Sequence, residues 1–286
     1  AFEWFLSRLP ARAPLQRAVF AAFALILFTQ GWVYLTYVRQ SNAAATDPGI
    51  HLTPVHYLVN VREALAPYRD ILIAGGTTGE SGQPVWKALL YRRADCVREL
   101  VIASGGVAVF PAQPFAVISP PGALAPAASD LYETDSPMVV PLRPGEGGYT
   151  IEAFAAAPDW NGPPLADVTP VAFDNGVALT GYLLNGDRVY LRWTLPGAGE
   201  RGYQYFAHFL DAAGERVGQQ DASFYPEHFW CEGDTIITWI DAGIPAETET
   251  LRVGMYALEG ERFVNSSVLD DAGNAEGLWA DIPLDN

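Results

Sequence analysis

The segment 224–230 holds the densest group of side chains that could do chemistry, namely four aromatic rings and a histidine. The residues in it that we single out as candidate ligand-binding residues are Phe224, Tyr225, His228 and Trp230. Sugar-binding modules present aromatic faces to pyranose rings, so one interpretation is a glycan-binding loop. The other is that the rings fill the core or contact a protein, because aromatic residues dominate both settings.

No catalytic grouping is assembled by local spacing, since neither a carboxylate pair nor a Ser/His/Asp set stands together. His51 and His56 are five residues apart, but no third metal ligand lies nearby. The acidic loop 270–276 lacks the length and order of an EF-hand, so we expect a solvated turn. The glycine-rich segment 75–82 lacks a P-loop ending, so we expect a flexible turn. We therefore expect no catalytic residue, metal or cofactor in this chain.

The elements that must position the aromatic segment are short alternating runs that follow residue 147. Residues 189–195 alternate between apolar and polar side chains, which is typical of a half-buried strand. The pair Asn185-Gly186 before this run predicts a type I′ hairpin to the run 177–184. Several such runs, separated by turn residues, predict an antiparallel β-sandwich over residues 146–286.

Two further runs, 203–210 and 251–258, show the same alternation. In the first of them His208 lies between Ala207 and Phe209 and points to the opposite face. We expect His208 to face solvent or a groove.

Residues 46–145 have a different pattern, in which helical and strand-like runs alternate. We predict helices that begin near 53 and 84, a buried strand at 71–74, and strands at 97–103 and 115–119. A small α/β domain follows from this order, with a Pro-rich connection after residue 111.

An uncharged stretch of 21 residues runs from Ala18 to Val38. At 1.5 Å per residue it is about 31 Å long, enough to cross the bilayer. Arginines at 8, 12 and 17 precede it, so the positive-inside rule places the N-terminus in the cytoplasm and the bulk of the chain outside. The alternative is a cleaved signal peptide, although the stretch exceeds the usual apolar region of about 7–15 residues. We predict a cytoplasmic stub and transmembrane helix over residues 1–45.

The charge distribution agrees with this topology. The chain has 17 basic and 33 acidic residues, and residues 1–40 hold four of the basic and one of the acidic ones. The part after residue 40 therefore carries a net charge of −19. Such a surface disfavours nucleic acid as a partner. Cys96 and Cys231 fall in different predicted domains, so a disulfide between them is possible outside the cytoplasm but not required, and two buried free thiols are the simpler expectation.

The second half of the chain resembles the C-terminal extracytoplasmic sandwich of multi-spanning bacterial glycosyltransferases of the protein-mannosyltransferase type. The runs that carry the resemblance are FDNGVALTGY (173–182), LRW (191–193), YFAHFLD (205–211), QQD (219–221) and GD (233–234), with Gly214, Trp230 and the upstream phrase PLRPGEGGY (141–149). A last membrane helix followed by a small α/β unit is similar to the same tail. These motifs are turn and core residues, so the resemblance implies a fold and transfers no catalytic residue.

Together these features predict a membrane-anchored α/β plus all-β protein. We expect an extracytoplasmic, non-catalytic module that binds or positions a glycan or a membrane protein. The alternative is a single-span accessory subunit of a large membrane complex, such as an energy-converting one. The chain begins at Ala1 rather than Met, so we expect a processed product or the tail of a longer polypeptide.

Overall fold

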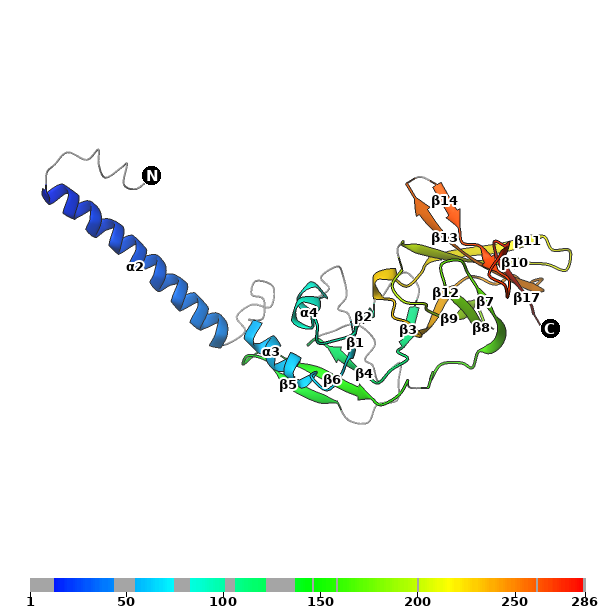
Figure 1. Cartoon of the computed structure of the whole chain (residues 1–286), viewed down its shortest axis with the longest axis horizontal. Helices are drawn as coiled ribbons and strands as arrows, with labels where there is room; N and C mark the ends of the chain where they lie inside the picture. The colour runs from blue at the N-terminus through cyan, green and yellow to red at the C-terminus, as the bar shows by residue number, and fades with distance from the viewer. Residues whose placement is uncertain are drawn as a thin grey trace. The chain divides into compact units, whose positions relative to one another are not determined.

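The structure, a computed structural model, describes residues 13–43, 55–74, 83–100, 106–121, 137–145, 147–157, 159–199, 201–260 and 262–284 (Figure 1). The predictions for His51 and for the segment 75–82 lie outside the described residues. Two compact units make up the chain. The first comprises Ala1–Leu58 with Leu142–Gly147, and the second comprises Val59–Pro141 with Gly148–Asn286.

Within the described residues, the first unit contains the long helix α2 (Ala13–Ala43). Its stretch Ala18–Gln40 is long and apolar enough to cross a membrane, and none of its side chains is buried inside the protein. The hydroxyl of Thr29 donates to the carbonyl of Leu25 at 2.7 Å, so this polar group is satisfied within the helix itself. The predicted single apolar N-terminal helix is thus confirmed, and its length and composition fit a membrane anchor and a signal sequence equally.

The second unit begins with a five-stranded sheet in the order β2-β1-β4-β6-β5. Its strands are β1 (Asp70–Ala74), β2 (Cys96–Leu100), β4 (Phe115–Ser119), β5 (Met138–Pro141) and β6 (Gly148–Phe154). The central strand β1 runs parallel to β2 and β4, and it is buried throughout, as expected for a strand inside a parallel group. The helices in this part of the chain are α3 (Val55–Ala64) and α4 (Gln83–Leu89).

Two antiparallel sheets form a sandwich-like body in the rest of the unit (Figure 1). One sheet has the order β3-β12-β9-β8-β7, and the other has the order β11-β10-β13-β14 with β17 paired to β13. The first is built from β3 (Gly106–Phe110), β7 (Ala166–Ala172), β8 (Ala178–Asn185), β9 (Arg188–Thr194) and β12 (Thr235–Asp241). The second is built from β10 (Tyr203–Leu210), β11 (Arg216–Ser223), β13 (Thr250–Glu259), β14 (Arg262–Asn265) and β17 (Ala280–Pro283). Three short elements complete it: η1 (Glu227–Phe229), β15 (Val268–Leu269) and β16 (Ala275–Gly277).

The two sheets share one apolar core. Trp193 of β9 and Tyr205 of β10 lie with their ring centroids 5.8 Å apart, and both rings are buried. The indole N–H of Trp193 donates to the hydroxyl of Thr238 at 2.9 Å, so the largest core side chain leaves no polar atom unpaired. Alternation along the strands therefore separates a core face from an outer face, as the sequence predicted.

The predicted hairpin between β8 and β9 is present, but its turn type differs. Asn185 pairs with Arg188, and Gly186 has φ of 58°. Among the described residues other than glycine only Arg92 has a positive φ, so Asp187 does not adopt the second left-handed conformation of a type I′ turn. A type II′ turn has a positive φ only at the first of its two central positions, and Gly186 occupies that position.

The α/β sheet and one sheet of the sandwich each contain strands from both sides of the domain limit predicted at residue 145. Strand β6, after that limit, pairs with β4, while β3, before it, pairs with β12 through Phe110 and Thr235. The chain consequently passes from the α/β sheet to the sandwich at β3, returns to the α/β sheet at β4, and enters the sandwich again at β7.

Candidate functional site

A groove of about 580 Å³ lies on the outer face of the sheet that contains β10, β11 and β13. Alternation places it there, because Tyr205, Ala207 and Phe209 of β10 point into the core while Phe206 and His208 point the other way. The groove is lined by Phe206, His208, Leu210, Gly214, Arg216, Asp221, Arg252, Tyr256, Phe263, Asn265 and Trp279. Aromatic rings and hydrogen-bonding side chains thus face one open space.

Two stacked rings form the floor of the groove. Phe206 and His208 have their ring centroids 4.4 Å apart and their planes 26° apart. Phe206 pairs with Gly254 across the sheet, and a Cβ at Gly254 would lie 2.2 Å from Cζ of that ring. Glycine is therefore needed on β13 so that the Phe206 ring can lie over the strand.

Asp221 marks one end of the groove. The hydroxyl of Tyr256 lies 2.7 Å from Oε1 of Gln204 and 3.0 Å from Oδ2 of Asp221, so its single hydrogen is shared between these two acceptors. Burial and the neighbouring carboxylate raise the pKa of Tyr256 to about 12, which keeps the hydroxyl protonated. The carboxylate is thereby held in place, with Oδ1 left to accept hydrogen bonds.

Arg252 and Trp279 form a rigid corner at the other side. Nε and Nη2 of Arg252 donate to the two oxygens of Asp281 at 2.7 and 2.9 Å. The same guanidinium lies 4.4 Å from the ring centroid of Trp279, which is 41% exposed. The guanidinium therefore covers one face of the indole, and the ion pair with Asp281 holds it there.

His208 lies between the charged groups of the groove. Burial lowers its pKa, and the nearby Arg216 lowers it further, against the opposing effect of Asp221. The imidazole is therefore neutral near pH 7, and it can both donate and accept a hydrogen bond. The expectation that His208 faces a groove is confirmed.

The aromatic residues singled out in the segment 224–230 lie elsewhere, in the core. Phe224, Tyr225 and Trp230 are each 3% exposed. The ring of Phe224 packs edge-on against Trp193 with centroids 5.3 Å apart, and the indole N–H of Trp230 donates to the carbonyl of Tyr225 at 2.8 Å. In this structure these rings have no face open to a sugar.

His228 differs from its neighbours because about half of its side chain is exposed. It lies on η1, with Nδ1 3.9 Å from the carboxylate of Glu227. The structure therefore separates His228 from the three buried rings and does not bring these residues together as one site.

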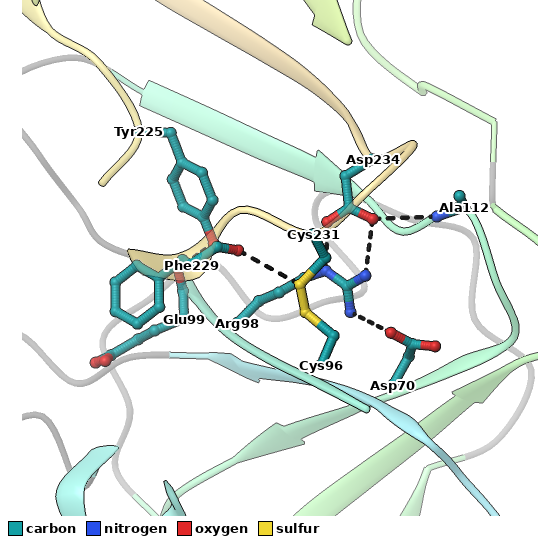
Figure 2. The surroundings of a disulfide bond; sticks show 9 residues. All are labelled: Asp70, Cys96, Arg98, Glu99, Ala112, Tyr225, Phe229, Cys231 and Asp234. Carbon is teal, nitrogen blue, oxygen red and sulfur yellow. Dashed lines mark hydrogen bonds and ion pairs between the residues drawn. A yellow bond between two sulfur atoms is a disulfide. The ribbon is translucent and has the colours of Figure 1, made fainter. Parts of the chain in front are cut away.

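The two cysteines pair as a disulfide, in contrast to the expectation of free thiols (Figure 2). Cys96 begins β2 of the α/β sheet, and Cys231 follows η1 in the sandwich, with the Cα atoms 6.3 Å apart. Next to it the hydroxyl of Tyr225 donates to the carbonyl of Glu99 at 2.9 Å. Spacing could not predict this pairing, because 135 positions separate the cysteines.

A buried ion-pair cluster lies beside the disulfide (Figure 2). Arg98 donates to Asp70 through Nη1 at 2.9 Å and to Asp234 through both Nε and Nη2. The backbone N–H of Ala112 also donates to Asp234. All three charged side chains are buried and paired, so the cluster is a structural joint between the two sheets rather than a reactive site.

The other candidate loops have structural partners. In the loop 270–276, Oδ1 of Asp270 accepts the backbone N–H groups of Ala272 and Asn274 at 2.9 and 2.7 Å, and these bonds lower the pKa of Asp270. Its carboxylate thus closes a turn. In the part of the chain that the structure describes, no group of three or more His, Cys, Asp or Glu side chains could hold a metal ion.

One feature of the sequence indicates the groove, namely a large apolar residue on the outer face of a strand. The alternation in residues 203–210 places the large apolar Phe206 on the outer face of β10, next to His208. The contributions of Arg252, Trp279 and Phe263 depend on strand pairing and could not be found from spacing.

Comparisons with protein-family models, with curated proteins and with solved structures give no significant match to this chain. The groove and the residues that line it are therefore the features from which a function can be inferred.

Proposed function

We propose that this chain is an extracytoplasmic, non-catalytic module of a glycosyltransferase-like membrane protein, and that it binds a glycan in the groove beside Trp279. The observation that carries the proposal is the combination of exposed aromatic faces with fixed hydrogen-bonding groups in one groove. In this proposal α2 is a single-pass anchor in the cell membrane with its N-terminus in the cytoplasm.

A pyranose has apolar C–H faces and a rim of hydroxyl groups, and the groove offers a partner for each. Trp279 is 41% exposed and Phe263 is 72% exposed, so both rings can cover a sugar face. Asp221 can accept hydroxyl hydrogens, and Nη1 of Arg252 can donate to hydroxyl oxygens. The volume of the groove falls within the range of about 300–1,000 Å³ typical of small-ligand sites.

Two observations support an extracytoplasmic location for the second unit. Disulfides persist mainly in oxidising compartments, and Cys96 pairs with Cys231. The arginines at positions 8, 12 and 17, before the apolar stretch, also agree with an N-terminus that is retained on the cytoplasmic side. The transferase context rests on the resemblance of the sequence runs given above.

The proposal can be tested with the full chain in lipid nanodiscs on a glycan array, followed by calorimetry with the glycans that bind. Trp279→Ala should weaken binding about threefold to tenfold, because it removes one stacking face. Tyr91→Ala is the matched control, since Tyr91 is 71% exposed and lies outside the groove. Absence of binding to any glycan at millimolar concentration would overturn the proposal.

A protein partner is a second candidate, favoured by the hairpin of β13 and β14. Leu258 and Phe263 are paired across this hairpin, and both are exposed. Such a pair fits the hydrophobic centre of a small protein contact, as an accessory subunit of a membrane complex would need. Co-purification in mild detergent that is lost in Leu258→Ser, with glycan binding unchanged, would support this role. Isolation of the wild-type chain as a monomer would count against it.

A further inference from the structure

We infer that the groove selects a pyranose that carries a carboxylate, with the carboxylate directed to Arg216 and Arg252. This inference rests on the proposed glycan-binding function and names the class of sugar. Its basis is the uneven distribution of the charged side chains that β11 and β13 place beside β10.

The strand register orders the polar groups of the groove in three successive rows. Asp221 lies opposite Phe206, Arg252 lies opposite His208, and Arg216 lies opposite Leu210. Positions two residues apart on a strand are about 7 Å apart, so the strand positions of Asp221 and of the two arginines are separated along the groove, with Arg216 furthest from Asp221. A bound sugar therefore meets an acceptor at one end and cations at the other.

The two arginines differ in how far their charge is compensated. Arg252 is paired with Asp281 through Nε and Nη2, which leaves the hydrogens of Nη1 without an acceptor among the described residues. Arg216 makes no ion pair with any carboxylate that the structure describes. Among the described residues, the basic end thus has one guanidinium without an ion-pair partner and a second guanidinium with free donors on Nη1.

At the basic end of the groove, the neutral imidazole of His208 adds one hydrogen-bond donor and one acceptor but no charge. Both guanidinium groups lie close enough to lower the pKa of its imidazole, and burial acts in the same direction. The anion-binding capacity near pH 7 therefore comes from the arginines, while His208 can bind a hydroxyl group.

The two arginines and His208 fit a sugar that carries a carboxylate better than a neutral sugar. A carboxylate on a ring can accept two parallel N–H donors from a guanidinium, which is the strongest hydrogen-bonding arrangement available here. Hydroxyl groups on the far side of the same ring would reach Asp221, and the ring face would rest against Trp279. With a neutral sugar, Arg216 would gain no charged partner.

The test compares uronates with their methyl esters, using the full chain in lipid nanodiscs and calorimetry. Glucuronate, galacturonate and mannuronate are each paired with the methyl ester, which keeps the ring and removes the charge. At least one acid should bind about tenfold more tightly than its ester. Arg216→Gln should reduce this preference at least threefold, because the acid loses a charged partner and the ester does not.

Arg188→Gln is the matched control, because Arg188 is an exposed arginine on β9 of the other sheet. It should keep the preference for the acid. Equal binding of acid and ester, or a preference that is undiminished in Arg216→Gln, would overturn the inference and leave the proposed function standing. Binding of no sugar, charged or neutral, would overturn both.

Discussion

The guanidinium of Arg98 is bound by the carboxylate of Asp234, which lies 136 positions further along the chain. Arg98 belongs to β2 of the α/β sheet, whereas Asp234 immediately precedes β12 of the sandwich. Both side chains are buried, and the disulfide from Cys96 starts only two residues away. The ion pair and the disulfide together fix the α/β sheet to the sandwich that carries the groove.

Removal of one partner from this joint should be strongly destabilising. Arg98→Met leaves the buried carboxylates of Asp70 and Asp234 without a counter-charge, and we expect the free energy of unfolding to fall by about 3–5 kcal/mol. Arg188→Met is the control, because its ion pair with Asp241 is exposed and should contribute less than about 1 kcal/mol. Urea titrations of both variants measure the difference, and equal losses would contradict a special role for the buried cluster.

Loss of the disulfide should destabilise the protein under oxidising conditions. The double variant Cys96→Ser, Cys231→Ser removes a link across 135 positions, and we expect a loss of about 2–5 kcal/mol in the free energy of unfolding. Reductant should lower the urea midpoint of the wild type and leave that of the double variant unchanged. If reductant shifts neither midpoint, the bond makes no contribution.

Gly254→Ala should disturb the floor of the groove. The added Cβ would lie 2.2 Å from the ring of Phe206, so that ring must move away from β13 and from His208. We expect a stability loss of about 1–3 kcal/mol and weaker glycan binding. Gly202→Ala is the control, because a Cβ there meets nothing within 4 Å. Unchanged glycan affinity in Gly254→Ala would show that the Phe206 ring does not form part of the binding surface.

Stability should depend on pH through His208. Its pKa in the folded protein is lowered by burial and by Arg216, so the unfolded chain binds more protons between that pKa and the ordinary value of about 6.5. The free energy of unfolding should therefore decrease as the pH falls below about 6.5. His208→Gln should remove this part of the decrease between pH 7.5 and 5, whereas the exposed control His228→Gln should retain it. Parallel pH profiles for the wild type and His208→Gln would contradict the assignment.

Local sequence patterns predicted those features that depend on neighbours along the chain. The uncharged stretch from Ala18 to Val38 predicted the helix, and alternation predicted strands such as β9 and β10. The Asn185-Gly186 pair predicted the hairpin, although the turn type was wrong because only Gly186 has a positive φ. Periodicity also placed His208 on the outer face of its strand, because successive side chains of a strand alternate.

Tertiary structure alone decided which of these residues meet. The rings of the segment 224–230 fitted a glycan site or the core, and the structure buries all four of them, with Phe224 packed against Trp193 and Trp230 packed against Phe224. The groove, in contrast, combines Phe206, Arg252 and Trp279 from three separate parts of the chain. The disulfide and the Arg98–Asp234 pair likewise join positions more than 130 residues apart. Local periodicity fixes the face on which a side chain lies, but strand pairing and sheet packing determine its partners, and both depend on contacts that spacing in the sequence does not encode.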